Sequence, residues 1–180
     1  DVYKRQVNSS WNFAMNMLDS VGIAGQTLVA TALGAGSVSR ARQLTRATGR
    51  AGLVTGAIIG VVFAIVGLFA GHLFSPPPHV QILIAVGMVT TGVFFPLQGW
   101  MMAIDGILIG ARDYRYLAGT CTLTAVVYIA LILVLASIVT PIMPNDLSRT
   151  AMLWAAFNVV LMGGRALFNG LRVRSDVWMK

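Results

Sequence analysis

The sequence contains no glutamate, its six acidic residues are all aspartates, and charged residues make up only 11% of the chain. Typical soluble domains carry about 25% charged residues. Hydrophobic residues, in contrast, reach 57%. This composition lies outside the soluble globular range and predicts an integral membrane protein.

Cysteine and histidine are also scarce, which limits the chemistry available to the chain. The single cysteine, Cys121, can build neither an internal disulfide nor a cysteine metal site, and we expect it to be a small core residue. The two histidines, His72 and His79, have no acidic residue close in sequence. An intramembrane enzyme needs a nucleophile–base pair or a metal cluster. We therefore predict no enzymatic activity, no catalytic residues, no metal and no cofactor.

A starting methionine is missing as well. The first residues, DVYKRQ, have neither the apolar core nor the cleavage site of a signal peptide. We interpret residues 1–8 as a truncated or non-native remnant, and we expect upstream helices of a longer parent chain to be missing.

Long apolar segments dominate the remainder, and a helix needs roughly 20 such residues to cross a bilayer. Five segments qualify, at about 11–34, 50–74, 80–110, 116–139 and 150–171. In lipid such runs must satisfy their own backbone, and the alternation of barrel strands is absent. The predicted fold class is all-α, with a five-helix transmembrane bundle over residues 9–174 and a tail at 175–180.

Basic residues concentrate in alternate connections and orient the predicted helices. SVSRARQLTRATGR and ARDYRY are rich in arginine, whereas SPPPH has no basic residue and TPIMPNDLSR has only Arg149. Because basic connections face the cytoplasm, we expect the first segment to enter from outside and the C-terminus to be cytoplasmic. The net charge of +7 comes without interleaved aromatic residues, so it does not indicate nucleic-acid binding.

Small residues recur every four positions and predict close helix packing. A stripe of glycines in the second segment forms a groove for another helix, and a GxxxG step closes the third segment. The predicted packing residues are Gly52, Gly56, Gly60, Gly106 and Gly110.

Polar residues form a stripe along three of the predicted helices. The stripes are Asn12, Asn16, Asp19 and Gln26 in the first; Thr91, Gln98 and Asp105 in the third; and Asn158, Arg165, Asn169 and Arg172 in the fifth. A charge inside a membrane is costly unless it is paired or hydrated, so these faces should line a bundle interior or a water-filled cavity. Methionine and tryptophan residues lie beside the stripes, either as ordinary core or as contacts for apolar ligands: Met15, Met17, Trp100, Met101 and Met102.

The ionisable residues of the predicted helices are expected at different depths in the membrane. Asp105 and Arg165 both lie roughly 8–9 Å inside the cytoplasmic ends of their helices, at 1.5 Å per residue. Either they form an ion pair, or Arg165 extends alone to the headgroups. Asp19 is nearer the outer end of its segment, so we expect it on the opposite side of the membrane from Asp105.

Two longer motifs give the chain a family resemblance. LDSVGIAGQTLVATALGAGSVSRARQ resembles the second helix of the C-terminal lobe of multidrug and toxic compound extrusion (MATE) transporters, and FPLQGWMMAIDGILIGARDYRYL resembles the family's tenth helix. The pair Asp105-Gly106 is most similar to the DNA-damage-inducible F-type branch. The resemblance implies that the five predicted helices of this chain correspond to helices eight to twelve of that fold. Ser37 and Arg112 depart from the family's turns. Gln98 stands near the position at which some branches of the family have a cation-coupling carboxylate.

This resemblance implies part of a secondary antiporter that exports toxic amphipathic compounds in exchange for protons or sodium. The implied pathway residues are Asp19, Gln26, Thr91, Gln98, Met102, Asp105, Asn158 and Arg165. The implied partners are the bilayer of a bacterial inner membrane, small cationic substrates and the missing N-terminal lobe, with no nucleic acid. Two alternatives stay open: a lipid-linked saccharide flippase of the same superfamily, and a fragment that is inactive without its first lobe.

Overall fold

The computed structural model describes residues 2–69, 77–143 and 145–179, which contain helices and no strand. Four long α-helices come first: α1 (Val2–Gly34), α2 (Val38–Phe69), α4 (Pro78–Gly110) and α5 (Tyr114–Val134). The last rod joins α6 (Asp146–Ala156), the π-helical segment η3 (Phe157–Met162) and α7 (Gly163–Arg174). Three short segments complete the description: η1 (Leu135–Val139), η2 (Thr140–Ile142) and η4 (Asp176–Met179).

Within the described residues, four helical segments are long and apolar enough to cross a membrane. They are Val38–Phe69, Pro78–Gly110, Tyr114–Val139 and Asp146–Arg174. The predicted all-α membrane fold is therefore confirmed. Helix α1 has a similar length but is not among the four, because Asn12, Asn16, Asp19 and Gln26 interrupt its apolar residues.

Helix α1 also begins earlier than the predicted first segment. It starts at Val2, and the side chain of Val7 is fully buried in a core cluster with Ile84 and Trp154. Residues 2–8 thus extend the first helix. The end of the predicted second segment, with His72, lies outside the described residues, and His79 is exposed at the start of α4.

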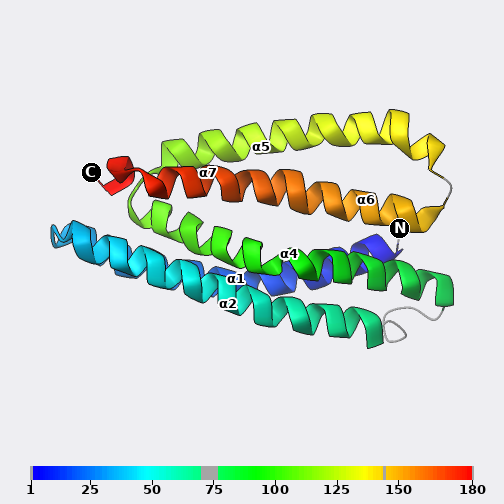
Figure 1. The fold of residues 1–180 in the computed structure, drawn as a ribbon, viewed down its shortest axis with the longest axis horizontal. Coiled ribbons are helices and arrows are strands. Elements are labelled where there is room, and N and C mark those ends of the chain that lie inside the picture. The colour runs from blue at the N-terminus through cyan, green and yellow to red at the C-terminus, as the bar shows by residue number, and fades with distance from the viewer. Residues whose placement is uncertain (1, 70–76, 144, 180) are drawn as a thin grey trace.

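Helix α4 occupies the centre of the bundle. Figure 1 shows α4 between α1 and α2 on one side and the rod of α6 and α7 on the other, and α4 contacts each of them. Helices α1 and α4 run in the same direction and end near the arginine-rich turns. The two arginine-rich connections therefore lie at the same end of the bundle, as the predicted topology requires.

Glycine lets the backbones of α2 and α4 touch. A Cβ atom on Gly52, Gly56 or Gly60 would overlap a backbone carbonyl oxygen of α4, at Gly99, Phe95 and Gly92 respectively. Backbone contact of this kind gains van der Waals packing and Cα–H···O contacts that a larger residue would prevent. The predicted groove of α2 therefore faces α4.

The GxxxG step of α4 makes the same kind of contact with α1. A Cβ atom on Gly106 would overlap the carbonyl oxygen of Gly22, and a Cβ on Gly110 would meet the carbonyl oxygen of Gln26 at 2.5 Å. These two contacts fix the level at which α1 lies against α4.

The turns after α1 and α4 have the same backbone geometry. In each, the last helical turn is closed by paired backbone hydrogen bonds, from Ser37 N to Ala32 O and from Asp113 N to Leu108 O. Gly36 and Arg112 occupy the left-handed position of these turns, with φ of 70° and 61°. Glycine is the usual residue there, so Arg112, which departs from the family pattern, is strained.

Substituting Gly56 by alanine should destabilise the chain by about 1–3 kcal/mol, because the added methyl group meets a backbone carbonyl that cannot move aside. Thermal unfolding in detergent, followed by tryptophan fluorescence, measures the effect. Gly119→Ala is the matched control, since a Cβ there meets nothing within 4 Å. Equal stability of the Gly56→Ala chain and the control would contradict the close α2–α4 contact.

Candidate functional site

The polar stripe of α4 packs against the polar stripe of the last rod. We call this contact the polar seam, formed by Thr91, Gln98, Asp105 and Asp113 on one side and Asn158, Arg165, Asn169 and Arg172 on the other. Residue numbers rise together along both partners, so α4 and the last rod run parallel. The seven-residue spacing of Thr91, Gln98 and Asp105, matched by that of Asn158, Arg165 and Arg172, keeps these polar groups in register.

Gln98 is the centre of the first level of the seam. Its side-chain oxygen accepts the indole N–H of Trp11 at 2.9 Å, and its amide nitrogen donates to Asn158 Oδ1 at 2.6 Å. Asn158 in turn donates to the carbonyl oxygen of Trp154 at 2.7 Å and lies 3.4 Å from the hydroxyl of Thr91. Thr91, Gln98 and Asn158 are all fully buried. Their hydrogen bonds offset the cost of placing amides in an apolar bundle.

Asn158 also lies in the π-helical segment η3. Single π-helical turns are uncommon and often occur at functional positions. Here the segment supplies the asparagine that bonds Gln98.

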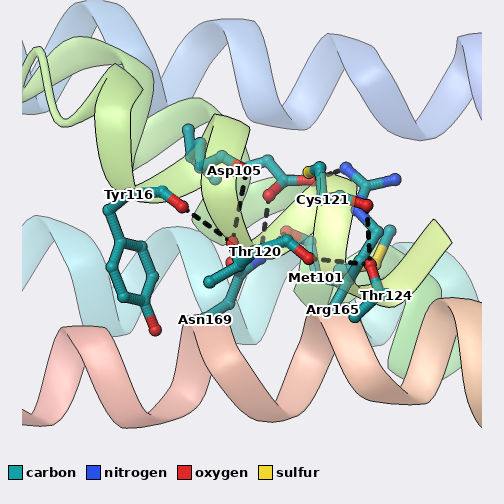
Figure 2. Close-up of polar contacts among 9 residues, drawn as sticks. Met101, Asp105, Tyr116, Thr120, Cys121, Thr124, Arg165 and Asn169 are labelled. Carbon is teal, nitrogen blue, oxygen red and sulfur yellow. Dashed lines mark hydrogen bonds and ion pairs between the residues drawn. The ribbon is translucent and has the colours of Figure 1, made fainter. Parts of the chain in front are cut away.

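Asp105 forms the second level of the seam (Figure 2). Arg165 Nη2 donates to Asp105 Oδ2 at 2.5 Å, and Asn169 Nδ2 donates to Asp105 Oδ1 at 2.8 Å. Both carboxylate oxygens therefore have a partner, and Asp105 is only 8% exposed. Of the two alternatives left open by the sequence, the structure contains the ion pair. The Nε atom of Arg165 is buried without a hydrogen-bond partner among the described residues.

A third level closes the seam at the basic end. Arg172 donates from Nε to Asp113 Oδ2 at 2.6 Å, and its guanidinium lies 4.6 Å from the centre of the Tyr116 ring. The Tyr116 hydroxyl donates to the carbonyl oxygen of Phe168 at 2.7 Å. This level ties the turn between α4 and α5 to α7. Asp113 was not predicted from the sequence, because it lies beyond the end of α4 and the left-handed turn at Arg112, where helical spacing no longer applies.

A pocket of about 360 Å³ opens beside the second level, and we call it the carboxylate pocket. Helices α1, α4, α5 and α7 all contribute to its wall. Its polar and ionisable lining residues are Asp19, Gln26, Asp105, Tyr114, Cys121 and Arg165, and its apolar lining includes Met102 and Leu117. Cys121 is thus a half-buried pocket residue.

Asp19 lies in the same pocket as Asp105, which corrects the expectation that the two are on opposite sides of the membrane. The error came from counting depth from the start of the apolar segment. The contacts of Gly22 with Gly106 and of Gln26 with Gly110 set the real level, and they leave the end of α1 projecting beyond the end of α4.

Other predicted pathway residues are distributed differently. Thr91, Gln98 and Asn158 lie in the polar seam and do not line the carboxylate pocket, so their role in a pathway stays a prediction. Asn12 and Asn16, which belong to the polar stripe of α1 but not to the predicted pathway residues, are exposed. The α5 residues of the pocket had no signal in the sequence, because α5 carries no polar stripe.

A comparison with protein families identifies the chain. Residues 6–134 match the family model described as MatE. The chain belongs to the MatE family. With its apolar helices, this membership identifies a multi-pass membrane protein. The predicted family is confirmed.

Two curated relatives are plant proteins. The chain is 27% identical over 127 residues to Protein DETOXIFICATION 42 of Arabidopsis thaliana, which covers 71% of this chain and 25% of that protein. It is 23% identical over 166 residues to Protein DETOXIFICATION 45, chloroplastic, of the same plant, covering 91% of this chain and 26% of the relative. The MatE chain thus spans about a quarter of the length of these relatives. No solved structure matches it.

Replacing Asp105 and Arg165 by alanine, singly and together, should give non-additive losses of stability. Each single change leaves a buried charge without its partner, whereas the double change removes both charges. We expect a coupling energy of at least about 1 kcal/mol from thermal unfolding of the four chains. Losses that add to within about 0.5 kcal/mol would contradict the ion pair.

Gln98→Leu should destabilise the MatE chain by about 1–3 kcal/mol, because the Trp11 indole N–H and the Asn158 amide lose their partner in the core. Gln43→Leu, at an exposed position of α2, is the control and should change stability by less than about 0.5 kcal/mol. The same unfolding measurement compares them. A Gln98→Leu chain as stable as the control would show that this level of the seam contributes little.

Proposed function

We propose that the MatE chain forms part of a secondary antiporter that exports cationic amphipathic compounds in exchange for protons or sodium. The family match supports transport, and both relatives are named as detoxification proteins. We further propose a place in the F-type branch, on the resemblance carried by Asp105-Gly106, and a plasma membrane of bacterial type.

The observation that carries this proposal is the contrast between two aspartates in one pocket. Asp105 is buried and held by Arg165 and Asn169. Asp19 is exposed, lines the same pocket, and has no hydrogen-bond or ion-pair partner among the described residues. An unpaired carboxylate on a membrane helix is costly against lipid, so its face is suited to a water-filled pathway.

The pocket supplies the parts that an exchange reaction needs. Asp19 offers a carboxylate that binds either a proton, a sodium ion or the positive group of a substrate, but not two of them together. Binding of one therefore displaces another, which is the elementary requirement of antiport. Arg165 keeps Asp105 occupied, so we assign Asp105 to positioning the pocket wall. Met102 and Leu117 provide apolar surface for the rest of an amphipathic substrate.

Alternating access in this proposal needs a second set of helices. The polar face of α1, with Asn12, Asn16 and Asp19, is exposed and would face the other lobe across a central cavity. We propose that the remainder of a longer parent chain supplies that lobe. The arginine-rich end of the bundle, with the C-terminus, would then be cytoplasmic.

Asp19→Asn in the full-length parent should reduce ethidium efflux at least about tenfold, which corresponds to ~1.4 kcal/mol of lost interaction. Efflux is measured by fluorescence in a pump-deficient strain, at two pH values and with or without sodium, so that the coupling ion is identified too. The effect is expected because asparagine binds neither a proton nor a cation.

Asp146→Asn is the matched control, since Asp146 is an exposed aspartate in α6 outside the carboxylate pocket. It should leave efflux within about twofold, a change below ~0.5 kcal/mol. If Asp19→Asn matches that control while both proteins reach the membrane in equal amounts, the assignment of Asp19 is wrong.

A further inference from the structure

A second polar pocket, of about 650 Å³, lies at the arginine-rich end between α2, α4, α7 and η4. We call it the basic pocket. Its ionisable lining residues are Arg42, Arg46, Arg50 and Arg174, and its aromatic walls are Trp100 and Trp178. Among the side chains that the structure describes, no aspartate lines this pocket. This pocket is separate from the carboxylate pocket and plays no part in the proposed exchange.

The charge of the basic pocket is only partly explained by topology. Arg46 and Arg50 follow each other at one helical turn on α2, and Arg174 reaches the pocket from the end of α7. All three are exposed and have no ion-pair partner among the described residues. Basic residues anywhere in a cytoplasmic connection between helices are enough to orient a membrane protein, so orientation does not require them to surround a pocket. Three guanidinium groups around one hollow additionally form a site for an anion with several acceptor oxygens.

The lining changes from basic to apolar along α2. Arg46 and Arg50 lie toward the helix start, and Leu53 follows at the inner edge of the pocket with 47% of its surface exposed. The distance from Arg46 to Leu53 along the helix is roughly 10 Å, at 1.5 Å per residue. Exposed apolar residues continue beyond it at Val54, Ile58 and Val61. This order matches a molecule with an anionic head and an apolar tail.

Trp178 adds an independent observation. It is 3% exposed, it lines the pocket, and its indole N–H has no acceptor among the described residues. Buried indole N–H groups usually have a partner. A ligand with acceptor oxygens at this place would supply the missing one.

We propose that the basic pocket binds a phosphate group, and that the source of this phosphate is the headgroup of an anionic phospholipid. Arg46, Arg50 and Arg174 hold the phosphate oxygens, and the acyl chains follow the apolar face of α2 past Leu53. Basic pockets between membrane helices are known to take such headgroups. A lipid bound here contacts both α2 and α7.

Native mass spectrometry of the MatE chain in detergent tests this proposal by titration with phosphatidylglycerol and with phosphatidylcholine of identical acyl chains. The wild-type chain should retain phosphatidylglycerol at least about tenfold more tightly. The double variant Arg46→Gln/Arg50→Gln should lose that preference. Arg40→Gln/Arg115→Gln is the matched control, because it removes two exposed arginines of the same end that do not line the pocket. It should keep the preference.

Separate titrations with inorganic phosphate and glycerol 3-phosphate identify the source of the phosphate. If these soluble compounds displace phosphatidylglycerol at equal concentration, the natural ligand is a soluble phosphate and the lipid proposal is wrong. If they do not displace it, the result supports a phospholipid headgroup as the source of the phosphate. Equal retention of both lipids by the wild-type chain would overturn the proposal without any variant. Equal loss in the pocket and control variants would also overturn it, because general charge would then explain the binding.

Discussion

Close backbone contact at glycine holds α4 to α1 and α2, and the remaining structure is arranged around α4. In lipid, two apolar helices gain little by leaving the hydrocarbon, so association depends on tight packing and polar contacts. Gly52, Gly56 and Gly60 supply the packing toward α2, and Gly106 and Gly110 supply it toward α1. The polar seam holds α4 on its third side. All three contacts are made by α4. The position of each neighbouring helix along α4 therefore decides which side chains share a pocket.

The polar seam and the carboxylate pocket divide the polar residues into two groups. Thr91, Gln98 and Asn158 are fully buried and bonded to one another, which makes them a structural layer. Asp105 lies at the boundary, since it lines the pocket while Arg165 and Asn169 occupy both of its oxygens. Leaving either partner of such a pair alone would cost more than the pair itself gains. The pair therefore fixes the pocket wall, whereas Asp19 is exposed and has no such partner among the described residues.

Much of this arrangement was predictable from periodicity. The all-α membrane fold, the glycine grooves and the polar stripes follow from spacing, because a helix places every third or fourth residue on one face. The level of one helix against another does not follow, and Asp19 was misplaced for that reason: the Gly22–Gly106 contact sets it, not the start of the apolar segment. The π-helical segment at Asn158 and the α5 residues that line the carboxylate pocket could not be predicted from the sequence either, because neither feature changes the hydropathy pattern. Even the basic pocket needs α7 and η4 folded back beside α2, which no local pattern encodes.

The most direct test of this account is a thiol cross-link between Asp19→Cys and Cys121, the single native cysteine, in membranes. Both positions line the carboxylate pocket, from α1 and α5. A short bifunctional thiol reagent should join them. Met17→Cys is the control, since Met17 is on the opposite face of α1, lines a separate apolar pocket and is 50% exposed. The account predicts an intramolecular cross-link for position 19 and none for position 17. Equal cross-linking at both positions, or none at position 19 while its thiol reacts with a monofunctional reagent, would contradict the placement of Asp19 in the carboxylate pocket with Cys121.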